Sequence, residues 1–174
     1  MAEAFGSAEV EAVVPRLRRY ARALTGNREA ADDLTQDTLE RAWSKRLLWQ
    51  PGTDLRAWMF TIMHNVFVNG TRRNRPTVSL DDSPMDDVLP ATSTSVETGI
   101  VLAELSRALA LLPAEQREVL LLVGLEQFSY SEASEVLGVP LGTVMSRLSR
   151  GRERLRILLE TGATERPVAL RRVK

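Results

Sequence analysis

Apolar residues recur at helical spacing along most of the 174-residue chain, and this pattern stops over one stretch, residues 76–98. Ser, Thr, Asp and Pro dominate that stretch, which is the composition of a solvated linker rather than of a core element. No alternation typical of strands appears on either side of it. The sequence therefore predicts an all-α protein of two small helical domains joined by a flexible acidic linker.

Pro and Gly residues mark the expected ends of the helices, because neither residue propagates a helix well. Ser129 and Glu132 form a capping-box pattern at the start of the helix before the last one, and Gly138 is the expected end of that helix. The predicted division is a first domain at 1–75, a linker at 76–99, a second domain at 100–162 and a basic tail at 163–174. Within the domains, the apolar spacing predicts helices at about 10–25, 28–47, 54–75, 100–112, 114–124, 131–137 and 141–159. On the helix expected at 28–47, Asp33, Gln36, Asp37 and Glu40 fall off the apolar stripe and are expected on the polar face.

The charge and composition exclude several classes of protein. The chain has 23 basic and 23 acidic residues, so its net charge alone does not indicate a nucleic-acid partner. It has no cysteine and one histidine, which exclude a disulfide framework and a cysteine-ligated metal, and which leave little for catalysis. No signal peptide or membrane-spanning run is apparent. These features predict a cytoplasmic protein with no membrane insertion, metal or cofactor.

The last two predicted helices have the dimensions of a helix-turn-helix, in which the second helix lies in the major groove of DNA. On that helix the predicted buried stripe is Val144, Leu148, Gly151, Leu155 and Leu158. A basic flank of Arg147, Arg150 and Arg154 lies beside the stripe, and arginine suits both phosphates and guanine edges. DNA contact is the favoured interpretation, and a solvated basic face is the alternative.

Seven of the nine aromatic residues lie in the first domain. Trp43 and Trp58 fall on apolar stripes, which predicts that they pack in the core. Phe60 and Phe67 fall off the Trp58 stripe, near polar Asn65, and such faces suit the stacking of unpaired bases. A single-stranded nucleic acid is therefore a candidate ligand of this domain.

Two groups of motifs resemble a known family. Residues 33–43, beginning Asp33-Leu34-Thr35-Gln36-Asp37, and residues 54–65 resemble sigma domain 2 of the bacterial extracytoplasmic-function (ECF, group 4) sigma factors. Leu112-Pro113, Gln116-Arg117, Phe128-Ser129-Tyr130 with Glu132, and residues 138–148 are similar to sigma domain 4 of that family. The resemblance covers about residues 8–160.

The resemblance implies three binding surfaces, and each is carried over at matching positions only. Contact with the β′ clamp helices of core RNA polymerase, whose β subunit is also an expected partner, is implied for Asp33, Gln36, Asp37 and Glu40. The resemblance also implies a surface that melts the minus-ten element, holds a flipped base and binds the phosphates of that element. Its residues are Trp58, His64, Asn65, Arg72, Arg73 and Arg75. Recognition of the minus-thirty-five element is implied for Thr143, Met145, Ser146, Arg147 and Arg150.

The implied function is promoter recognition and DNA melting for transcription initiation. The protein would carry no catalytic residue, would be associated with the nucleoid when in holoenzyme, and would serve stress-response genes under an anti-sigma factor. Many family members have Lys or Arg at position 145 and Ala at position 151, where this chain has Met145 and Gly151. These two departures affect which promoter sequence is recognised and not the activity itself. The alternatives are a stand-alone helix-turn-helix regulator with an interaction bundle, and an adaptor that mimics a sigma factor to sequester its inhibitor.

Overall fold

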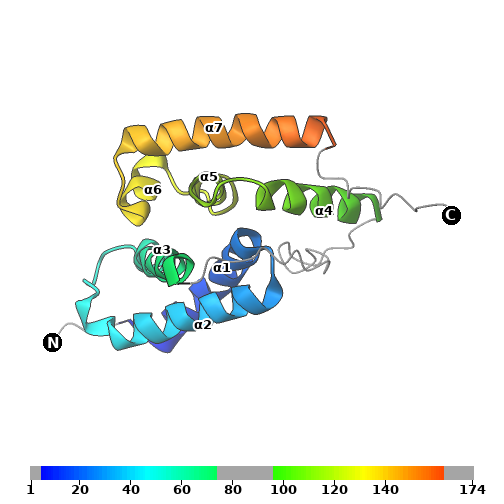
Figure 1. Cartoon of the computed structure of the whole chain (residues 1–174). Coiled ribbons are helices and arrows are strands. Elements are labelled where there is room, and N and C mark those ends of the chain that lie inside the picture. The colour runs from blue at the N-terminus through cyan, green and yellow to red at the C-terminus, as the bar shows by residue number, and fades with distance from the viewer. Residues whose placement is uncertain (1–4, 74–95, 163–174) are drawn as a thin grey trace.

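A computed structural model describes residues 5–73 and 96–162, and the regular structure within these residues is helical (Figure 1). The predicted all-α class is confirmed. Arg75, most of the predicted linker and the predicted basic tail lie outside the described residues. None of the helices in the described part is long and apolar enough to cross a membrane.

The amino-terminal unit consists of α1 (Ser7–Thr25), α2 (Arg28–Ser44), the short 3-10 turn η1 (Arg46–Leu48) and α3 (Leu55–Arg73). Gly26 ends α1 with a left-handed φ of 67°, which glycine adopts without strain. Asn27 then caps α2, because its side-chain oxygen accepts a hydrogen bond from the backbone N–H of Ala30 at 2.9 Å. The expected helix at 28–47 ends at Ser44, because the chain tightens into η1.

The carboxy-terminal unit consists of α4 (Val96–Ala110), α5 (Ala114–Leu120), the π-helical turn η3 (Leu121–Leu125), α6 (Tyr130–Leu137) and α7 (Leu141–Glu160). The helix α4 begins at Val96, earlier than the expected residue 100. The helix expected at 114–124 is interrupted by η3, whose wider turn is marked by a hydrogen bond from Glu126 N–H to the Leu121 carbonyl.

The helix-turn-helix expected from the sequence is formed by α6 and α7. Ser129 and Glu132 form the predicted capping box at the start of α6, and Gly138 ends that helix with a φ of 62°. Val144 and Leu148 are buried on α7. Gly151 is also buried, and a Cβ there would lie 3.0 Å from Leu120 of α5. The predicted apolar stripe of α7 is therefore the face that packs inward.

The two units pack directly against each other, which the sequence did not predict. Figure 1 shows α1–α3 on one side and α4–α7 on the other. Phe60 of α3 lies edge-on to Tyr20 of α1 and to Phe128 of the carboxy-terminal unit, with ring centroids 5.1 and 5.2 Å apart. A continuous cluster of buried residues runs from α1 to α7. The described residues thus form a closed arrangement, a term used below for the two units in contact.

Two predictions about the aromatic residues are wrong. Trp43 is 52% exposed, because the stripe of α2 that packs inward lies beside it rather than on it. Phe60 is 1% exposed and cannot stack on a base in this arrangement, because both units cover it. Trp58 is half-buried against Phe5, as expected for a packing residue, and Phe67 is partly buried against the core.

Candidate functional site

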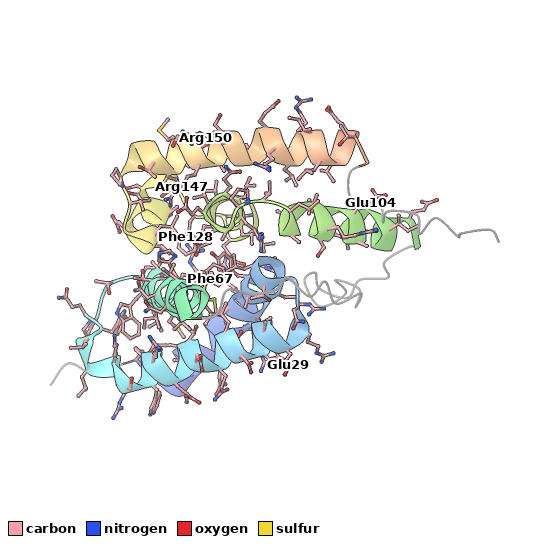
Figure 2. All side chains as sticks on the ribbon, in the orientation of Figure 1. Glu29, Phe67, Glu104, Phe128, Arg147 and Arg150 are labelled. Carbon is pink, nitrogen blue, oxygen red and sulfur yellow. The ribbon has the colours of Figure 1, made fainter. Side chains whose placement is uncertain are left out.

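The outer face of α7 presents a mixed polar, basic and apolar surface (Figure 2). Arg150 is exposed, Met145 is 51% exposed, and Thr143 and Ser146 are partly exposed. Arg147 is less available, because its guanidinium lies 3.4 Å from the carboxylate of Glu115 on α5. The structure thus places the predicted reading residues on one helix, with Arg150 as their most accessible cation.

One arginine and two glutamates form an ion cluster near the end of α7. The Arg156 guanidinium contacts the Glu153 and Glu160 carboxylates at 2.7 Å each. Hydrogen bonds from Arg156 lower the pKa of Glu153, and the two carboxylates raise the pKa of Arg156. Arg156 is therefore neutralised locally, whereas Arg152 and Arg154 remain exposed cations of this helix.

The outward face of α2 is acidic and polar, as the sequence predicts. Asp33, Gln36, Asp37 and Glu40 are all exposed, and the Gln36 amide donates to Glu40 at 3.0 Å. An apolar groove beside this face is lined by Phe5, Val10, Leu39, Ala42 and Trp43, together with Gln36, Glu40 and Ser44. This combination of exposed charge and apolar groove makes α2 a candidate protein-docking surface.

The predicted residues of α3 do not converge on one point. Asn65 is exposed, and Trp58 packs against Phe5. His64 lies toward the other unit, where its Nδ1 is 2.7 Å from the buried carboxylate of Glu118 on α5. Arg72 and Arg73 lie in the last turn of α3, with side chains outside the described set. In the closed arrangement, part of the predicted minus-ten surface therefore contacts the carboxy-terminal unit.

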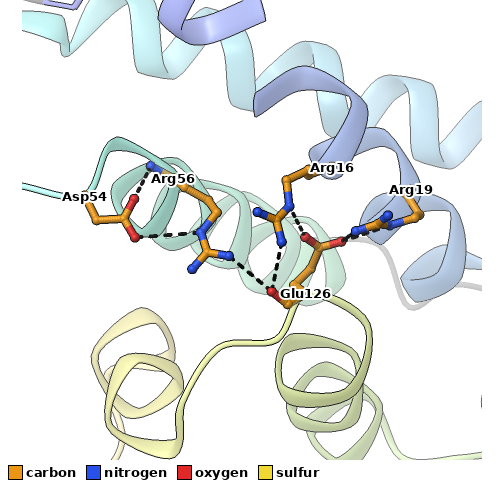
Figure 3. Close-up of polar contacts among 5 residues, drawn as sticks. All are labelled: Arg16, Arg19, Asp54, Arg56 and Glu126. Carbon is orange, nitrogen blue, oxygen red and sulfur yellow. Dashed lines mark hydrogen bonds and ion pairs between the residues drawn. The ribbon is translucent and has the colours of Figure 1, made fainter. Parts of the chain in front are cut away.

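Glu126 is the centre of the polar contacts between the units (Figure 3). Its side chain is 0% exposed, and its carboxylate accepts hydrogen bonds from Arg16 at 2.9 Å and Arg19 at 2.8 Å, both on α1. Its backbone carbonyl accepts from Arg16 and from Arg56 of α3, each at 3.1 Å. The Arg56 guanidinium also lies over the Phe128 ring, 4.1 Å from its centroid. The loop after η3 thus contacts both helices of the other unit: Glu126 binds α1 and α3, and Phe128 lies against Arg56 of α3.

Arg117 makes a further contact between the units. Its guanidinium donates to the carbonyls of Leu109, Ala110 and Leu112 at the end of α4, and to that of Leu24 in α1. Burial lowers the pKa of Arg117, although the nearby Glu118 carboxylate opposes that shift. Its position at two helix carboxyl ends suits a cation, since orphan carbonyls lie there.

Sequence reasoning missed the roles of Glu126, Arg16 and Arg19. One signal was present: Glu126 is the single charge between the apolar run 119–125 and the aromatic Phe128. A lone acid beside an apolar run indicates a buried and paired carboxylate. Its partners are more than 100 positions away and could not be identified without the fold.

Both units match models of known families. The model described as the Sigma2 domain of PhyR matches residues 10–64, and the model described as Sigma-70, region 4, matches residues 102–155. The first match covers most of the amino-terminal unit, and the second covers most of the carboxy-terminal unit including the helix-turn-helix.

Similar proteins match over nearly the whole chain. The ECF RNA polymerase sigma factor EcfG of Rhodopseudomonas palustris is 39% identical over 90% of this chain and 86% of its own length. The ECF RNA polymerase sigma factor SigL of Mycobacterium tuberculosis is 34% identical over 94% and 99%. Among solved structures, the sigma factor RpoE in complex with the anti-sigma factor NepR from Bartonella quintana is 37% identical, with a TM-score of 0.73 over 88% of this chain and 95% of RpoE.

Proposed function

The chain belongs to the ECF RNA polymerase sigma factors, and from this membership we propose that it directs core RNA polymerase to promoters and opens the DNA there. The observation that carries the proposal is the helix-turn-helix of α6 and α7, whose outer face carries exposed Arg150 beside Thr143 and Ser146. A second helix of this kind enters the major groove and contacts base edges.

The α7 residues would read the minus-thirty-five element. Arg150 would bind a phosphate or a guanine edge, and Thr143, Met145 and Ser146 would contact neighbouring groups in the groove. Arg147 would join them after exchanging its contact with Glu115 for one with DNA. The two residues that differ from many family members, Met145 and Gly151, have different places: Met145 is exposed, and Gly151 packs on Leu120.

The α2 face would bind the polymerase. Its exposed acids, Asp33, Asp37 and Glu40, with Gln36, suit a basic surface such as the β′ clamp helices, and the adjacent groove with exposed Trp43 suits an apolar side chain of the partner. The carboxy-terminal unit would contact the β subunit. The protein would act in the cytoplasm, on the nucleoid when in holoenzyme.

The α3 residues would act on the minus-ten element. Asn65 is exposed in the structure and would hydrogen-bond a base extruded from the duplex, next to Trp58, while Arg72, Arg73 and Arg75 would bind phosphates. His64 would become available after its contact with Glu118 is broken. The chain would supply binding energy alone, and the polymerase would form the phosphodiester bonds, so the protein is not an enzyme.

An anti-sigma factor would be the regulatory partner. RpoE of Bartonella quintana, to which this chain is similar, was solved in complex with the anti-sigma factor NepR. Two small units with separate binding faces would also gain stability from such a partner, since a ligand that binds only the folded state stabilises it.

The test is gel filtration of the purified chain with bacterial core RNA polymerase, followed by transcription of host genomic fragments by the eluted complex. Co-elution and discrete transcripts are expected. Co-elution without transcripts would indicate an adaptor that mimics a sigma factor. Binding of duplex DNA by the chain alone, without co-elution, would indicate a stand-alone regulator and refute the proposal.

Replacement of Arg150 by Ala then tests the α7 surface. We expect weaker promoter binding by the holoenzyme and a salt dependence that is shallower by about one unit of slope, because one fewer phosphate is neutralised. Arg152→Ala is the matched control, since it removes the same charge from another side of the same helix. Equal effects of the two variants would count against a specific contact at Arg150.

A further inference from the structure

The cluster around Glu126 is built from three arginines. Arg16, Arg19 and Arg56 converge on one glutamate, and a second carboxylate, Asp54, lies 3.7 Å from Arg56 and is 47% exposed (Figure 3). The Glu132 carboxylate is also near enough to Arg56 for that arginine to help lower its pKa. All three arginines belong to the amino-terminal unit, whereas Glu126 belongs to the carboxy-terminal unit. If the units separate, α1 and α3 keep an arginine cluster that has lost its central anion.

The geometry of this cluster suits an oxyanion in general. Arg19 donates from Nε and Nη2 to one carboxylate oxygen at 3.1 and 2.8 Å, and Arg16 donates from Nε to the other oxygen at 2.9 Å. The planar fork of arginine matches the oxygens of carboxylate and of phosphate in the same way. Arg16, Arg19 and Arg56 keep 37, 27 and 20% of their side-chain surface exposed even in the closed arrangement.

Promoter binding requires the units to separate, and this step rests on the proposed function. The minus-ten and minus-thirty-five elements lie roughly 80 Å apart on duplex DNA, because each base pair adds about 3.4 Å of length. The longest helix, α7, has 20 residues and spans about 30 Å. In the closed arrangement α3 contacts α6 and α5, so α3 and α7 cannot reach both elements at once. Glu126 must therefore leave the arginines when DNA is bound.

We propose that Arg16, Arg19 and Arg56 form a phosphate-binding site for promoter DNA. In the closed arrangement Glu126 occupies this site, with its carboxylate on Arg16 and Arg19 and its backbone carbonyl on Arg56, and it vacates the site when the units separate. Arg56 stands in the first turn of α3, the same helix that carries Asn65 and His64. His64 and Arg56 both contact the carboxy-terminal unit in the closed arrangement, so a strand held at His64 after the units separate would pass along the side of α3 that carries Arg56. Glu126 and a DNA phosphate then compete for the same three guanidinium groups.

The test compares the two sides of this ion cluster in the intact holoenzyme, using promoter DNA found by the transcription assay and measuring affinity at several salt concentrations. Glu126→Gln should leave the salt slope unchanged and the affinity equal to or tighter than that of the wild type, because the competing charge is removed. The double variant Arg16→Gln with Arg19→Gln should bind promoter about tenfold more weakly, with a slope shallower by about two, because two phosphate contacts are lost.

Two control proteins separate phosphate binding from a structural role. Arg18→Gln removes an exposed charge of the same helix and should change nothing. Arg16→Lys with Arg19→Lys loses the fork but keeps the charge, so it should retain the wild-type slope. If both sides of the cluster weaken promoter binding alike, or if the Gln double variant keeps the wild-type slope, the arginines serve closure alone and the proposal is wrong. Absence of promoter binding by the wild-type holoenzyme would overturn the proposed function as well.

Discussion

Two charged clusters in this protein have similar chemistry and different surroundings. At Glu126, one fully buried carboxylate is bound by arginines more than 100 positions away in the chain. At Arg156, one guanidinium is bound by carboxylates three and four positions away on the same helix, and all three side chains are more than half exposed. The first cluster connects the two units, and the second lies on the surface of one helix.

The difference in surroundings decides what each cluster contributes. Water competes for exposed charges and screens them, so ion pairs at a helix surface contribute little to stability. A buried carboxylate has lost its hydration and depends on its partners, so removing either side leaves an uncompensated charge. Glu126 should therefore control the contact between the units, whereas Arg156 should control little beyond its own helix.

The largest effect is expected for Glu126→Ala, which leaves Arg16 and Arg19 without their carboxylate. The cost to the closed arrangement should be about 2–5 kcal/mol, toward the lower end because both arginines remain partly exposed to water. Differential scanning calorimetry should show a lower melting temperature, or two separate transitions for the two units. A single transition at the wild-type temperature would remove the distinction between the two clusters.

A smaller effect is expected for Ser129→Ala at the capping box of α6. The Ser129 hydroxyl accepts from the Glu132 backbone N–H at 3.2 Å, and losing such a cap costs about 1 kcal/mol. Chemical denaturation of the carboxy-terminal unit should show the loss. Ser129→Asp, which can also cap a helix, should restore most of it. A loss as large as that of Glu126→Ala would mean that local caps stabilise this fold as much as the contact between the units.

The same box predicts a weak acid sensitivity. Hydrogen bonds from the backbone N–H and side chain of Ser129 lower the pKa of the Glu132 carboxyl in the folded protein. Its contribution to stability is present above the ordinary carboxyl pKa and is lost as the pH falls through the lowered value. Thermal melts of Glu132→Gln should therefore decline less than those of the wild type on acidification. Parallel declines would exclude this residue as a source of the acid sensitivity.

The smallest effect is expected for Arg156→Gln. Its partners Glu153 and Glu160 are exposed and return to water when it is removed, so the melting temperature should not shift measurably. Circular dichroism melts at low and high salt provide the measurement. A shift comparable to that of Glu126→Ala would contradict the comparison between the two clusters.

The same contrast separates what the sequence predicted from what it did not. The capping box, the Gly138 helix end and the apolar stripe of α7 depend on residues within a few positions of one another, and each was predicted. The exposed acids of α2 were predicted from the same kind of periodicity. These features follow from helix geometry alone.

The features that the sequence did not predict depend on contacts between distant segments of the chain. Phe60 fell off the expected stripe and is buried, because Phe128 of the other unit covers it. The interruption of the helix by η3 places Glu126 against α1, and apolar periodicity carries no signal for such a turn. The contact of His64 with Glu118 was also not predicted, because the sequence did not predict that the units pack together; the DNA-binding role of His64 stays a prediction.

We infer that the two units are in contact in the free chain and separate on a promoter. The chain has no cysteine, so Glu29→Cys on α2 and Glu104→Cys on α4 would give two unique and exposed labelling sites, both seen in Figure 2. The distance between spin labels at these sites should be measured in the free chain and in a transcribing promoter complex. We expect a short distance in the free chain and an increase of several tens of Å in the complex, because the promoter elements lie roughly 80 Å apart. The same short distance in both states would contradict this inference.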